Sequence, residues 1–246
     1  MTMTTTRPTA DIRGQAKDKE RTMTITGATL IRWAGVALMV AGVIFAAIQP
    51  IHPADVVASL TTGAWAIFTP LKTAMCLLFL LGLTGLYARQ VNQAGWLGLA
   101  GFLLLSLSWA SNLVFIFAEA FIMPLLVPTA PRFVEGFLGI FNGHPTAATL
   151  GALPTLYGLG GILYMLGGLV FGLATLRAGI LPRWPAALLA VAATLTPLAA
   201  LLPHNIQRLA GMPVGIALAA LGYALWAERR AAAAQPVAGT VSSRLT

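Results

Sequence analysis

The sequence predicts an all-α polytopic membrane protein, a bundle of six transmembrane helices with the N- and C-termini both cytoplasmic. Of the 246 residues, 58% are hydrophobic and only 9% are charged, whereas about a quarter of the residues are charged in an average soluble domain. The apolar residues also gather in six stretches long enough to cross about 30 Å of hydrocarbon as α-helices. Transmembrane β-strands would be about ten residues long and would alternate in polarity, so these longer stretches predict helices.

The expected spans follow one another with short connections. They run from about Leu30 to Ile48, Ala64 to Tyr87, Trp96 to Met123, Ala148 to Leu176, Trp184 to Leu202 and Leu209 to Ala227. A short loop around Arg89 to Gly95 should join the second and third spans as an antiparallel hairpin. We expect residues 28–230 to form the transmembrane domain and the segments 1–27 and 231–246 to be disordered cytoplasmic tails, with Met23 as an alternative start to Met1.

Lysine and arginine residues predict the orientation, because they stay preferentially in cytoplasmic loops. With the N-terminus inside, 12 of the 15 fall in inner loops, tails or span ends, Arg132 and Arg208 fall outside, and Lys72 lies within a span. These residues are spread over short segments rather than gathered on one face with aromatic side chains, so we expect no nucleic-acid partner. The expected partners are membrane lipid and, through glycine-rich helix faces, other membrane subunits or a second copy of the chain.

Two ionisable side chains, Lys72 and Glu119, lie inside expected spans, where a charge is costly unless it is paired or reaches water. Their spans form the hairpin, so we expect the two side chains to come within reach of each other near the outer face. The pair would either fix the register of the helices or line a ligand cavity or ion path. Polar residues on the same helix faces complete the set of ligand-binding or ion-pair candidates: Thr69, Thr73, Ser108 and Asn112.

The histidines suggest a second kind of site, because all three fall on the outer side. Together with Asp55 they form the candidate ligands of zinc or another divalent ion, namely His52, Asp55, His144 and His204. Their spacing matches no standard metal motif. A lipid or a pigment is the other cofactor class considered, although a histidine that ligates a pigment or haem usually projects from within a span. Cys76 is the only cysteine, so the chain cannot form an internal disulfide.

The outer connection between Pro124 and Pro145 differs from the other connections in length and composition. It is too rich in proline to continue the preceding helix. Its apolar residues, which include Phe133, Phe137 and Phe141, favour an interfacial segment that caps the bundle. If the outer half of the bundle holds a cavity, this segment is its natural lid.

Two inner segments carry a family resemblance. The connection from Arg177 to Trp184 reads R-A-G-I-L-P-R-W, and the run from Gly85 to Gln90 reads G-L-Y-A-R-Q. Both resemble segments common among bacterial multi-pass membrane proteins of unknown function. The motifs consist of basic residues with glycine and proline at tight turns. The resemblance implies a six-helix protein of the bacterial inner (plasma) membrane, and it carries no activity and no catalytic residue.

The leading functional hypothesis is a non-enzymatic membrane protein. It would be an accessory subunit of a membrane complex, or a binder of a small apolar ligand or lipid in an outward-facing polar pocket near Lys72, Asn112 and Glu119. The chain has little mass outside its spans and no complete catalytic motif. One alternative is a metal-dependent membrane enzyme with an outer histidine and carboxylate site and Glu119 as proton carrier. Another is a proton- or ion-coupled transporter with Lys72 and Glu119 as the coupling pair.

Overall fold

A computed structural model describes residues 25–142, 148–199, 202 and 204–234, and these residues contain helices and turns but no strand. Four helical stretches of this part are long and apolar enough to cross a membrane: Gly27–Ile48, Gly63–Leu126, Leu153–Ala178 and Arg208–Glu228. The prediction of an all-α protein with membrane-spanning helices is therefore confirmed in this coarser form. The segments 1–24 and 235–246, which were expected to be disordered tails, lie outside the described residues.

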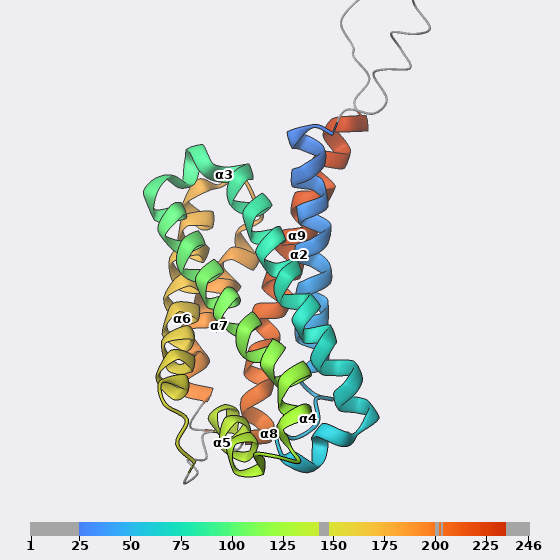
Figure 1. The fold of residues 1–246 in the computed structure, drawn as a ribbon. Helices are drawn as coiled ribbons and strands as arrows, with labels where there is room; N and C mark the ends of the chain where they lie inside the picture. The colour runs from blue at the N-terminus through green and yellow to red at the C-terminus, as the bar shows by residue number, and fades with distance from the viewer. Residues whose placement is uncertain (1–24, 143–147, 200–201, 203, 235–246) are drawn as a thin grey trace, which may run out of the picture.

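The longest helix, α3 (Gly63–Phe117), folds back on itself at Gly95. Gly95 has φ 54° and ψ −150°, a left-handed conformation that glycine adopts at little cost because it has no Cβ. The expected loop from Arg89 to Gly95 is wrong in extent, since the chain stays helical through residue 94 and reverses at this glycine. Residues 63–94 form the first arm of α3 and residues 96–117 form the second arm, and the two arms run in opposite directions (Figure 1).

The remaining long helices pack around the two arms of α3 (Figure 1). Helix α2 (Gly27–Ile48) packs against α9 (Met212–Ala234) and α3, while α6 (Leu153–Ala178) packs against α3 and α7 (Arg183–Ala199), which also contacts α9. Leucine and phenylalanine side chains from these helices fill the core, including Leu38, Phe79, Leu105, Phe171 and Leu218, all fully buried. The start of α2, the turn at Gly95 and the end of α9 lie at the same end of the bundle.

Helices α2 and α9 approach so closely that one contact requires glycine. A Cβ atom added to Gly42 would lie 2.5 Å from the carbonyl oxygen of Gly215 and 2.5 Å from the backbone nitrogen of Ala219. No side chain fits in that space unless the helices separate. Small residues therefore serve contacts within the chain here, which is how such residues let transmembrane helices approach each other.

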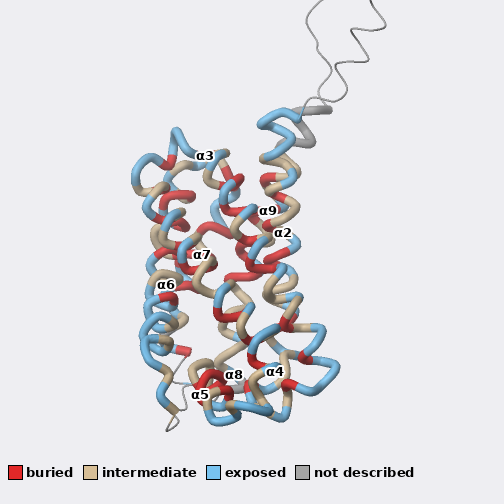
Figure 2. The backbone as a smooth tube through the Cα atoms, in the orientation of Figure 1, coloured by how far each residue is buried: buried red, intermediate tan, exposed pale blue. Residues whose placement is uncertain are grey.

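Short helical segments close the opposite end of the bundle, where α4 (Met123–Leu126), α5 (Pro131–Asn142) and α8 (His204–Gln207) lie (Figure 1). Helix α5 buries Val134, Phe137 and Leu138 in a second apolar cluster with Trp65 and Phe115 of α3. Figure 2 shows this burial in α5. The apolar segment of the outer connection thus packs on the end of the bundle, as its composition predicts.

Some of the observed helix ends differ from the expected spans. Helix α6 begins at Leu153 rather than at residue 148, and α9 continues through Ala234, four residues into the segment expected to be a tail. The described part of helix α7 has 17 residues and ends where the described residues end, at Ala199. It is not among the four stretches that are long and apolar enough to cross a membrane, so the count of six spans stays a prediction.

Candidate functional site

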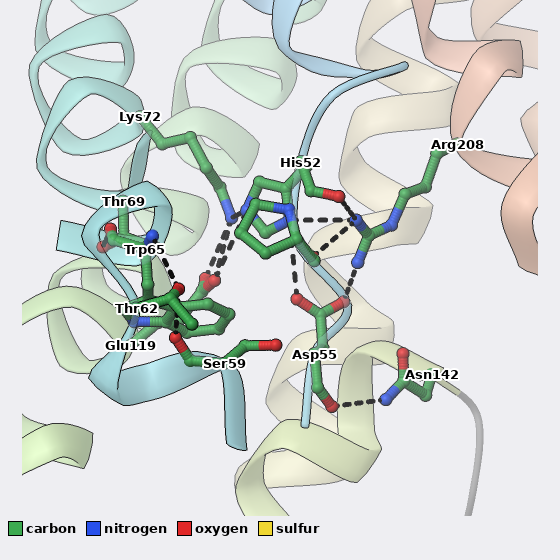
Figure 3. Close-up of polar contacts among 11 residues, drawn as sticks. His52, Asp55, Ser59, Thr62, Trp65, Thr69, Lys72, Glu119, Asn142 and Arg208 are labelled. Carbon is green, nitrogen blue, oxygen red and sulfur yellow. Dashed lines mark hydrogen bonds and ion pairs between the residues drawn. The ribbon is translucent and has the colours of Figure 1, made fainter. Parts of the chain in front are cut away.

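A cavity of about 480 Å³ lies in the bundle, between α2, both arms of α3, α6, α7 and the 3₁₀ turn Arg208–Gly211 (η3) that precedes α9. Apolar and aromatic side chains form much of its wall, among them Phe45, Met75, Trp109, Tyr157 and Tyr164. Four ionisable side chains and one histidine gather on the same cavity: Lys72, Glu119, Asp55, Arg208 and His52. We call these five residues the polar cluster (Figure 3).

The first ion pair of the cluster joins the first arm of α3 to the turn Ala118–Ile122 that follows the second arm. The ammonium nitrogen of Lys72 donates to both carboxylate oxygens of Glu119, at 3.0 Å and 3.1 Å. The Lys72 side chain is 17% exposed, whereas the Glu119 side chain is only 1% exposed. The expected contact across the hairpin is thus present, and it neutralises a carboxylate that would otherwise be buried alone, at a cost of several kcal/mol.

A local change of helix type positions Glu119. Residues Ala118–Ile122 form a π turn, in which the backbone N–H of Met123 bonds to the carbonyl oxygen of Ala118, five residues earlier. Pro124 follows directly, and because proline has no N–H, the regular α-helical pattern is interrupted at this point. π turns inside helices are often found at functional sites. This one holds Glu119 at the place where its carboxylate reaches the first arm of α3.

His52 lies in the connection after α2, and its ring lies between the two cations of the cluster (Figure 3). Lys72 Nζ is 3.0 Å from His52 Nε2, and His52 Nδ1 is 2.6 Å from the carbonyl oxygen of Pro53. An ammonium can only donate, so Nε2 is the acceptor, and the proton of the neutral ring lies on Nδ1, which donates to the carbonyl oxygen of Pro53. Nη1 of Arg208 lies 2.9 Å from Nδ1 but cannot donate to a protonated nitrogen, so its acceptors are the carbonyl oxygens of His52 and Pro53. Burial, followed by the nearby charge of Lys72, lowers the pKa of His52 from 6.5 to about 4, so the ring is neutral at pH 7.

The second ion pair ties the start of α9 to the connection after α2. Nη2 of Arg208 donates to a carboxylate oxygen of Asp55, and Nη1 donates to the carbonyl oxygens of Pro53 and His52, at 3.1 Å and 3.3 Å. The side-chain amide of Asn142 donates to the backbone carbonyl oxygen of Asp55 at 2.7 Å. This bond connects the end of α5 to the cluster, so the cap and the charged groups form one assembly.

Arg208 is the residue of this cluster that sequence reasoning missed. It was counted only as one of two basic residues outside the membrane. The available signal was its placement, because an arginine that departs from the cytoplasmic preference and immediately precedes a span needs a carboxylate partner on the outer side. The structure also joins two predicted sets that had been kept apart: the Lys72 and Glu119 pair and the outer candidates His52 and Asp55.

Three of the remaining sequence candidates do not line the cavity. The hydroxyl groups of Thr69 and Thr73 donate to backbone carbonyl oxygens four residues earlier in α3, and the hydroxyl of Ser108 donates to the carbonyl oxygen of Gly160 at 2.9 Å. Thr69 and Thr73 thus bond within their own helix and Ser108 joins α3 to α6, and their role as ligand-binding candidates stays a prediction. Asn112 does line the cavity, while its amide donates to the carbonyl oxygen of Ser108.

The metal candidates come together only in part. One ligand atom each from His52, Asp55 and Glu119 lies within 4.8 Å of the others. His144 lies outside the described residues, and of His204 only the backbone is described. The ammonium of Lys72 and the guanidinium of Arg208 already occupy these ligand atoms. A divalent ion would therefore have to displace two cations or lie beside them, so the contacts favour two ion pairs over a metal centre.

The polar cluster and its cavity can hold a molecule that has an apolar body and a polar end. The chain offers no established relative from which to transfer a role, because no protein-family model, no curated protein and no solved structure matches it.

Proposed function

We propose that this protein is a non-enzymatic membrane protein that binds one small amphipathic molecule, such as a lipid, in the cavity beside the polar cluster. The observation that carries the proposal is the cavity itself, which has aromatic and aliphatic walls and charged, hydrogen-bonding groups gathered on one part of its lining. Ligand cavities in proteins commonly measure about 300–1,000 Å³ and combine apolar walls with a few placed polar groups. Its volume of about 480 Å³ suits a molecule of drug size.

We also propose that the bundle crosses a bacterial inner membrane six times, with α2, the two arms of α3, α6, α7 and α9 as spans. The sharp reversal at Gly95 supports two crossings by α3. Arg89 lies six residues before the reversal at Gly95, and Arg177 and Arg183 flank the connection between α6 and α7. The reversal and this connection lie at one end of the bundle, while α4, α5 and α8 lie at the other (Figure 1). Because basic residues favour cytoplasmic loops, this arrangement supports cytoplasmic termini and a cavity in the outer half. An accessory role in a larger complex stays a prediction.

A cavity-filling substitution tests the binding proposal. Gly161 lines the cavity, and a Cβ added there meets no atom within 4 Å, so Gly161→Leu should fold and place a side chain in the space of the ligand. Gly158, on the same helix, also meets no atom within 4 Å but does not line the cavity. Gly158→Leu is therefore the matched control.

The measurement is mass spectrometry of the lipids and small molecules that copurify with the protein in a mild detergent. We expect the wild type and Gly158→Leu to retain one amphipathic molecule per chain, and Gly161→Leu to lose it while its helical circular dichroism stays unchanged. Retention of the same molecule by Gly161→Leu, or no retained molecule in the wild type combined with no binding of added amphiphiles, would refute the proposal.

One observation supports a second candidate, a proton- or ion-coupled transporter. Lys72 contacts both the buried carboxylate of Glu119 and the ring of His52, so three titratable groups form a continuous chain beside the cavity. If they couple transport, Glu119→Gln should abolish pH-dependent flux of the bound molecule in liposomes while it leaves binding in place. Unaltered flux in this variant would exclude the coupling role and leave the binding role intact.

A further inference from the structure

We infer that the cavity selects a molecule whose polar end is an uncharged hydrogen-bond acceptor, such as a ketone, ester or quinone oxygen, over anionic and cationic amphiphiles of the same chain length. This inference rests on the proposed binding function and specifies its ligand class. It follows from two features of the polar cluster: its positive and negative charges are equal in number, and its cationic side chains are more exposed than its carboxylates.

The charges of the cluster cancel within the cluster. Lys72 is paired with Glu119, and Arg208 is paired with Asp55. The ring of His52 lies between the two cations, where a third positive charge is unfavourable, so it adds no net charge. Any charged head that entered the cavity would be a buried charge without a partner, unless it broke one of the existing pairs and left another group alone. An uncharged head avoids both costs.

The cations are the more accessible partners of their pairs. The Lys72 and Arg208 side chains are each 17% exposed, whereas those of Glu119 and Asp55 are 1% and 7% exposed. A molecule in the cavity therefore meets N–H donors before it meets carboxylate oxygens. The three donors of the Lys72 ammonium are already engaged by both oxygens of Glu119 and by Nε2 of His52. The guanidinium of Arg208 carries five donors and can donate to one more oxygen while it keeps Asp55 and the carbonyl oxygens of Pro53 and His52. An acceptor atom on the ligand matches this arrangement.

Three probes with the same C12 chain length and different heads measure the selectivity: dodecan-2-one, dodecane-1-sulfonate and dodecylammonium. Binding is measured by equilibrium dialysis at pH 7 with the full chain in phosphatidylcholine nanodiscs, and binding to protein-free nanodiscs is subtracted. We expect the wild type to bind the ketone at least tenfold more tightly than either charged probe. Gly161→Leu, which adds a side chain at a residue that lines the cavity, should abolish the protein-dependent binding of the ketone.

Changing the charge of the cluster should change the preference. Glu119→Gln removes one negative charge and leaves the cluster with a net positive charge, so the sulfonate should gain at least tenfold in affinity relative to the ketone. Asp55→Asn makes the same change in the other ion pair and should have the same effect. Glu135, an exposed carboxylate on α5, provides the control, because Glu135→Gln changes the total charge by the same amount without touching the cluster.

The outcomes separate this inference from the binding proposal. Cavity-dependent binding in which the sulfonate or the ammonium matches the ketone overturns the neutral-head selectivity and leaves the binding function standing. The selectivity is also overturned if the affinity for the sulfonate relative to the ketone stays unchanged in both Glu119→Gln and Asp55→Asn. The same holds if Glu135→Gln changes this relative affinity as much as the two cluster variants do. If none of the three probes binds in a way that Gly161→Leu abolishes, the binding function fails together with the inference. If a cluster variant does not fold, the affinity of the wild type for the ketone relative to the two charged probes alone decides whether the selectivity holds.

Discussion

The neutral histidine of the polar cluster makes the stability of the protein depend on pH. His52 has a pKa of about 4 in the folded protein, against 6.5 for an unperturbed histidine. Between these two values the unfolded chain binds a proton on this residue and the folded protein does not, so the free energy of unfolding falls as the pH falls from 6.5 toward 4. Above pH 6.5 the residue is neutral in both states and contributes no pH dependence.

The size of the effect follows from the same two pKa values. One pKa unit corresponds to about 1.4 kcal/mol, so acidification to pH 4 should remove about 3 kcal/mol through His52 alone. The side chain is only 5% exposed, so little solvent screening reduces this figure. The charged groups that face the ring are Lys72, Arg208, Asp55 and Glu119.

Comparison with His52→Gln isolates the histidine. Glutamine keeps a side chain that can accept from Lys72 but does not titrate, while every other titratable group is the same in both proteins. Unfolding is measured by dodecyl sulfate titration in mixed micelles, followed by far-ultraviolet circular dichroism, at pH 7, 6, 5 and 4. Between pH 7 and 4 the wild type should lose about 3 kcal/mol more than the variant. Parallel losses in the two proteins would show that His52 is not held neutral, and the charge balance proposed for the cluster would be wrong.

Further predictions concern the ion pair, the helix packing and the cap, and the same titration at pH 7 measures all of them. Lys72→Met should cost about 3–5 kcal/mol because it leaves a buried carboxylate alone, whereas the double variant Lys72→Met/Glu119→Gln should cost far less; equal costs would contradict the pairing. Gly42→Ala should cost about 1–3 kcal/mol because its Cβ would meet the backbone of α9 at 2.5 Å, while Gly158→Ala, which meets no atom, should be neutral or stabilising by up to about 1 kcal/mol. Phe137→Ala should cost about 3 kcal/mol or more, because this side chain is buried between α5 and α3; a smaller effect would mean that α5 packs loosely.

The cost of placing charge in hydrocarbon predicted the central contact of the site. Lys72 and Glu119 stand out in the sequence because they interrupt apolar runs, and the hairpin between their spans brings them together. Hydropathy locates a residue along a helix, but it contains no information about which neighbouring helix the residue faces. His52 and Asp55, assigned to a separate metal site, therefore turned out to contact the same groups.

The hydroxyl residues show a second limit of reading helix faces. Thr69 and Thr73 share a face with Lys72, yet their hydroxyl groups bond to carbonyl oxygens of their own helix. Serine and threonine can always satisfy themselves in this way, so their position on a polar face does not show that they face a cavity. Lysine and glutamate have no such local partner inside a helix, so a charged residue within a span is a stronger signal of contact with another helix than a hydroxyl residue is.

The distribution of charge divides the wall of the cavity into a charged side and an uncharged side. Ion pairs tie together the connection after α2, the first arm of α3, the turn Ala118–Ile122 and the start of α9. Helices α6 and α7 contribute to the wall only uncharged residues, among them Gly160, Gly161, Met165 and Thr196. A bound molecule with one polar end should therefore lie in a single orientation, with that end toward the charged side and its apolar body against α6 and α7.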